Sequence, residues 1–156
     1  MKGFLGRASG DAVTYVNAPT IAAARGITVH EQRRDDDEHQ DYVNLITLRS
    51  GSRNISGTLA GRRREARIVL IDDHLSDVPP ARYMLIAQND DRPGVIGRVG
   101  TVLGDAGVNI DNMDVGKTLK AGSAMMVIAT ATPTPPAVVE QLRQVPGVVE
   151  VITIGG

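Results

Sequence analysis

The sequence contains no cysteine and no tryptophan, and it has only one phenylalanine and three tyrosines among 156 residues. The lack of cysteine excludes disulfides, thiolate metal sites and a cysteine nucleophile, and it fits a reducing cytoplasm. The scarcity of aromatic side chains excludes an aromatic stacking platform for single-stranded nucleic acid. We therefore expect a cytoplasmic protein with an aliphatic core.

A large excess of charge and long apolar runs are also missing. The chain has 17 basic and 18 acidic side chains and a formal net charge of −1, so its overall charge gives no reason to bind nucleic acid or an anionic membrane. No apolar run approaches the roughly 18 residues that a membrane span requires. The hydrophobic fraction of 42% is enough to form a buried core.

Prolines mark the best candidate domain boundary, at Val78-Pro79-Pro80-Ala81, because proline cannot donate a hydrogen bond to a sheet. The first half is predicted to be an antiparallel sheet with one helix. Its β-prone runs are residues 11–16, 27–32, 42–49, 54–60 and 67–72, and its helix covers residues 20–25 before Gly26. We predict one domain over residues 1–79 and a second over residues 80–156.

The second half alternates strands and helices. Residues 93–106 place apolar side chains along one helical face, between Pro93 and the helix-ending Gly107. Residues 83–87, 108–115, 124–131 and 148–154 are predicted strands, and a second helix begins near Pro135. The order βαββαβ indicates a ferredoxin-like unit. The predicted fold class is therefore α+β.

The sequence shows no catalytic or metal motif that we would assign. Gly94, Gly97 and Gly100 are spaced GxxGxxG instead of GxGxxG, and the helix pattern accounts for them. The acidic run at residues 35–38, with His39, is better explained as a solvated loop than as a metal cluster. There is no GxSxG motif. We predict no catalytic residues, no metal site and no cofactor in this chain.

Two segments of the second half could nevertheless bind a small zwitterion. The segment before Pro93 leads into a helix N-terminus, whose free N–H groups suit a carboxylate. Asp91 there and Asn109 in the following strand could hold an ammonium and a hydroxyl group, but they could equally be a helix cap and a turn residue. In the first half, Arg67 begins an apolar strand and could hold an anion, whereas Arg62–Arg64 is better explained as a charged turn.

Residues 91–110, DRPGVIGRVGTVLGDAGVNI, resemble the opening of an ACT domain, a small-molecule sensor module. Residues 13–27, 42–48, 56–59 and 67–69 independently resemble the intervening, or allosteric substrate-binding, domain of bacterial long-form D-3-phosphoglycerate dehydrogenase. The whole chain is thus similar to the C-terminal regulatory region of that enzyme family. This resemblance implies that the chain begins inside the intervening domain and lacks the catalytic and NAD-binding domains.

The resemblance also implies a function and a site. ACT domains of this family pair side by side and bind L-serine, the feedback inhibitor, between two copies. Asn109 of one copy would face Asn89 and Asp91 of the other, although Asn89 replaces the family's more frequent His or Tyr. Arg67 matches a basic position that binds an anion in some members. The alternatives are an oligomerisation module, or a sensor of another small amino acid with no serine response.

Overall fold

The computed structural model describes residues 2, 5–6, 12–28, 42, 44–117 and 122–155, which fall into two compact units, residues 1–40 and 41–156. In the first unit, helix α2 (Ala18–Ala24) buries Ala18 and Ala22 against Leu5. Pro19 lies in its first turn, and Gly26 follows its end with a φ of 68°. The predicted helix is confirmed.

The predicted strand over residues 11–16 is wrong, because residues 12–14 are irregular and 15–17 form a turn. Thr14 and Asn17 explain the turn. The Thr14 backbone N–H donates to Asn17 Oδ1 at 2.6 Å, and the Asn17 N–H donates to Thr14 Oγ1 at 3.1 Å. Such side-chain bonds to the backbone compete with a strand. Ile27 and Thr28 are not in a strand either, and the rest of that prediction, like the acidic run at 35–39, lies outside the described residues.

The second unit begins with an antiparallel four-stranded meander in the order β1-β2-β3-β4. Its strands are β1 (Leu45–Ser50), β2 (Arg53–Ala60), β3 (Glu65–Ile71) and β4 (His74–Val78). Tight turns separate them at Gly51, Gly61 and Asp72, all with positive φ. Strand β4 was not predicted from the sequence.

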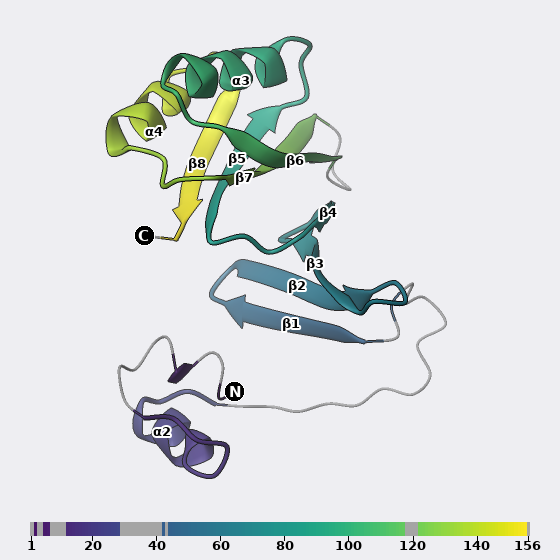
Figure 1. Ribbon diagram of the computed structural model, residues 1–156, viewed down its shortest axis with the longest axis vertical. Coiled ribbons are helices and arrows are strands. Elements are labelled where there is room, and N and C mark those ends of the chain that lie inside the picture. Colours follow the sequence, from purple (N-terminus) through teal and green to yellow (C-terminus); the bar gives the residue numbers. More distant parts are fainter. Residues whose placement is uncertain are drawn as a thin grey trace. The chain divides into compact units, whose positions relative to one another are not determined.

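A second sheet follows, with strand order β6-β7-β5-β8 and every neighbouring pair antiparallel. It contains β5 (Tyr83–Asp90), β6 (Ile110–Lys117), β7 (Ser123–Thr130) and β8 (Val148–Ile154). Helices α3 (Val95–Asp105) and α4 (Pro136–Arg143) cover one face (Figure 1). This is the predicted ferredoxin-like βαββαβ unit, and the α+β fold class is confirmed.

Each face of the second sheet has its own core. Beneath the helices lies a larger aliphatic cluster that includes Val99, Leu103 and Leu142. On the opposite face, Met84, Ile86, Met125 and Val127 pack against Ile68, Ile71 and Val78 of the first sheet. Both sheets therefore form one packed unit.

Strand β4 also contacts the edge strand β6. The Asp77 backbone N–H donates to Asp114 Oδ2 at 3.2 Å. Between the same two strands, Gly116 of β6 lies so close to the Leu75 carbonyl of β4 that a Cβ at residue 116 would overlap the carbonyl oxygen. The predicted division at residues 79 and 80 stays a prediction. No helix in the described part of the chain has both the length and the apolar character to cross a membrane.

Candidate functional site

Asn89 lies within β5, paired with Ala124 of β7 and Val148 of β8. Its side chain is only 3% exposed, and Nδ2 donates to the Asp90 carbonyl at 2.8 Å. Asn89 Oδ1 is buried and has no hydrogen-bond partner among the described residues. This oxygen can still accept a bond, but a ligand would reach it only if this end of the strand opened.

Asp91 follows β5 and is exposed in the short segment that leads into α3. The N-cap of α3 is Gly94, with a φ of 87° and no side chain to cap the helix, and the first turn contains no acidic residue. The free backbone N–H groups at the start of a helix carry a partial positive charge, which favours an anionic group nearby. The segment thus combines a carboxylate side chain with a helix end that suits a carboxylate ligand.

Asn109 lies just before β6 and is also exposed. The chain reaches it through Gly107, whose φ is 70°, and the Val108 N–H donates to the Leu103 carbonyl at 2.9 Å. Val108 is buried, while Asn109 Nδ2 donates to Asp111 Oδ1 at 2.9 Å. Among the described residues the Asn109 amide has one side-chain bond, which is exposed, so the amide is accessible to a ligand.

The structure places Asn109 and Asp91 at opposite ends of the sheet. Strands β5 and β6 are both antiparallel to β7, and Tyr83 and Ile110 both pair with Thr130. At the other end, Asp90 pairs with Ser123. Seven residue steps along a strand span about 24 Å. One copy of the chain therefore cannot bring both side chains to the same small ligand.

Arg67, the candidate anion-binding residue, contacts two carboxylates of its own sheet. Its Nη2 lies 3.6 Å from Glu65 Oε2, and its Nη1 lies 3.7 Å from Asp77 Oδ1. The side chain is 30% exposed. An anion at Arg67 would have to compete with both of these acidic groups.

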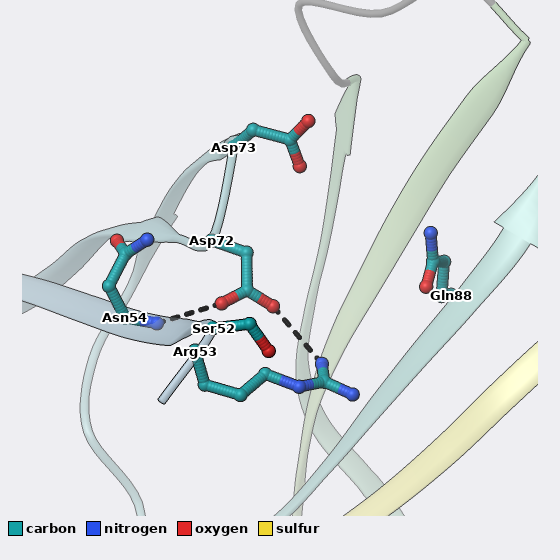
Figure 2. A pocket seen from close by; sticks show the side chains of 6 residues that line it. All are labelled: Ser52, Arg53, Asn54, Asp72, Asp73 and Gln88. Carbon is teal, nitrogen blue, oxygen red and sulfur yellow. Dashed lines mark hydrogen bonds and ion pairs between the residues drawn. The ribbon is translucent and has the colours of Figure 1, made fainter. Parts of the chain in front are cut away.

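A second polar feature, not predicted from the sequence, lies between the two sheets. A shallow pocket of about 450 Å³ is lined by Ser52, Arg53, Asn54, Asp72, Asp73 and Gln88 (Figure 2). Arg53 Nη1 donates to Asp72 Oδ2 at 3.0 Å, and Nη2 donates to both Glu150 carboxylate oxygens at 2.7 and 2.5 Å. Hydrogen bonds to Glu150 and then Asp72 raise the pKa of Arg53 above its usual value.

Arg53 therefore links the first sheet to β8 of the second. Asp72 also accepts the Asn54 backbone N–H at 2.8 Å, so this pocket is organised by bonds among its own residues. Because the link joins residues 97 positions apart, no local sequence pattern reports it. No group of three or more metal-ligating side chains occurs in the described ranges.

Comparisons with known proteins found matches to both halves of the sequence. Residues 1–72 match the family model of the D-3-phosphoglycerate dehydrogenase intervening domain, and residues 83–147 match the ACT domain. Together the two matches extend over most of the chain in the order predicted from the sequence.

Curated relatives match almost the whole chain. D-3-phosphoglycerate dehydrogenase from Synechocystis is 34% identical over 99% of this chain and 28% of its own length. The Bacillus subtilis enzyme is 34% identical over 97% of this chain and 29% of its own. The Archaeoglobus fulgidus enzyme is 30% identical over 96% of this chain and 29% of its own.

The chain thus spans less than a third of the length of these relatives. The resemblance to the regulatory region of these dehydrogenases, predicted from the sequence, is confirmed. The chain consists of an intervening domain of the D-3-phosphoglycerate dehydrogenase family followed by an ACT domain.

Proposed function

We propose that the chain is the regulatory part of a D-3-phosphoglycerate dehydrogenase and binds L-serine between two paired ACT domains, as a feedback inhibitor of L-serine biosynthesis. ACT domains bind small amino acids and often dimerise. Catalysis and NAD binding would then belong to other segments of the enzyme. Binding of L-serine to the regulatory part would lower the activity of those segments. Its cytoplasmic location stays a prediction.

The positions of the candidate residues support a site that needs two copies. Strand β6 is an edge strand of the second sheet. Lys117 at its end pairs with Ala124 of β7, and Asn89 of β5 pairs with the same residue from the other side, so Lys117 and Asn89 lie at the same level along the strand direction. If two β6 edges pair antiparallel, the start of one is level with the end of the other. Asn109 of one copy then lies at the same level as Asn89 and Asp91 of its partner. This correspondence of levels is the observation that carries the proposal.

The chemistry of these groups suits an amino-acid zwitterion. The start of α3 favours the ligand carboxylate, Asp91 offers a counter-charge for the ammonium, and the Asn109 amide can bond to a carboxylate or hydroxyl oxygen. Titration calorimetry with L-serine, glycine, L-alanine and inorganic phosphate tests the proposal. We expect heat of binding for L-serine, and its absence at millimolar concentration would refute serine binding.

One observation favours a second function, an oligomerisation module without a serine response. Asn89 is buried and its amide donates a hydrogen bond within its own chain. One of the three residues inferred to bind the ligand is therefore not accessible at the surface. Sedimentation analysis and thermal unfolding separate the two functions. A stable dimer whose thermal unfolding midpoint does not rise when L-serine is added would favour the oligomerisation module.

A further inference from the structure

We propose that Gly147, in the turn between α4 and β8, is a positioning residue that sets the shape of the segment carrying Asp91. This inference rests on the proposed function, because it concerns the same effector site. Gly147 lies far along the chain from Asp91, shortly after α4 ends at Arg143. The structure gives this turn a second role.

The described contacts within the segment from Asp90 to Gly94 include two between Asp90 and Arg92. The Arg92 backbone N–H donates to the Asp90 carbonyl at 2.6 Å, and Arg92 Nε lies 2.7 Å from Asp90 Oδ2. The Arg92 side chain is 77% exposed, so this ion pair is a weak constraint. The Val95 N–H reaches the Arg92 carbonyl only at 3.5 Å.

The turn between α4 and β8 is bonded to the chain on both sides of Asp91. Before Asp91, the Asp90 backbone N–H donates to the Gly147 carbonyl at 2.8 Å. After it, Arg98 Nη2 of α3 donates to the Pro146 carbonyl at 3.0 Å. Two adjacent carbonyl groups of one turn thus fasten the end of β5 and the first part of α3.

No side chain fits at residue 147. Gly147 has a φ of 97°, which L side chains rarely adopt, and a Cβ there would lie 2.7 Å from Val95 Cγ2 and closer still to Asp90 Oδ1. Asp90 Oδ1 is itself buried and has no hydrogen-bond partner among the described residues. Asp90 Oδ1 therefore lies against Gly147, while Oδ2 of the same carboxylate pairs with Arg92 Nε. A methyl group at residue 147 must displace the Asp90 carboxylate or the Val95 side chain. We expect this displacement to change the shape of the segment between them, which carries Asp91.

The test compares Gly147→Ala with Gly122→Ala. Gly122 also has a positive φ, of 89°, but a Cβ there meets no atom within 4 Å, so it reproduces the backbone strain without the displacement of Asp90. We expect Gly147→Ala to weaken L-serine binding at least tenfold in calorimetry and to shift the backbone amide resonances of Asp91 and Arg92. Gly122→Ala should leave both unchanged.

A purely structural role for Gly147 predicts a different result. It would lower the thermal midpoint while the Asp91 and Arg92 resonances and the affinity of the remaining folded protein stay at the wild-type values, and that outcome overturns the proposal. Should Gly147→Ala not fold, Arg98→Ala removes the bond to Pro146 without a substitution in the turn and should shift the same resonances. If the wild-type chain binds no L-serine, the proposed function fails, and the amide resonances alone still decide whether Gly147 positions Asp91.

Discussion

Replacing Asn109 with alanine tests the inferred serine site most directly. Asn109 is exposed, and its one described side-chain bond joins Nδ2 to Asp111 Oδ1 at 2.9 Å. Truncation leaves no cavity, since the side chain is not packed in the core. We therefore expect the free energy of unfolding to change by about 1 kcal/mol or less.

Serine affinity should change much more than stability. A hydrogen bond to a charged ligand group contributes about 1.5–3 kcal/mol, which corresponds to roughly a ten- to hundredfold loss in affinity. Titration calorimetry measures the affinity, and thermal unfolding of the same preparation measures the stability. An unchanged affinity for L-serine would show that the site is wrongly assigned. A large drop in the thermal unfolding midpoint would show that Asn109 stabilises the fold.

Asp111→Ala is the matched control for this experiment. It breaks the same bond between Asn109 and Asp111 but leaves the Asn109 amide available to the ligand. We expect it to retain serine binding within about threefold, because the bond between Asn109 and Asp111 is exposed and is not a ligand contact. An equal loss of affinity in both variants would mean that Asn109 acts only by holding Asp111.

Three further predictions concern the packing of the two sheets and the dehydrogenase activity expected of the chain. Gly116→Ala should destabilise residues 41–156 by about 1–3 kcal/mol, because its Cβ would overlap the Leu75 carbonyl, whereas Gly104→Ala in α3 meets no atom within 4 Å and should be neutral or stabilising in chemical denaturation. A double-mutant cycle of Arg53→Gln and Glu150→Gln should give a coupling energy of about 0.5–1 kcal/mol that falls with salt, because the pair is partly exposed, and a salt-independent coupling would contradict this explanation. The chain alone should not reduce NAD with 3-phosphoglycerate, and NAD reduction proportional to protein concentration would refute that expectation.

Hydrophobic periodicity predicted most of the second domain. The pattern over residues 93–106 corresponds to α3 at Val95–Asp105, and the predicted last strand coincides with β8. Strand β4 escaped prediction for a physical reason. Its buried positions alternate as a strand requires, but two of the three are the polar residues His74 and Ser76. Their burial against the second sheet depends on contacts that only the folded chain provides.

The hydrogen bonds around the candidate site could not be predicted from the sequence either. Asp90 and Gly147 are separated by most of the ACT domain, and their contact follows from the position of the turn before β8 beside the end of β5. The same holds for Arg53 and Glu150. Motifs identify residues with suitable chemistry, whereas the arrangement of strands decides which of them meet.

The position of Asn89 shows how a strand boundary affects a functional assignment. The apolar run predicted a strand that ends at Ala87, which would leave Asn89 in a surface loop. In the structure β5 continues to Asp90, because β7 pairs with it as far as Ser123 and β8 as far as Val148. Polar residues at a strand end give no local signal of this pairing. The extension by three residues moves Asn89 into the buried part of the sheet, so Asp91 and Asn109 are the two candidate residues that a ligand can reach without a change in the strand.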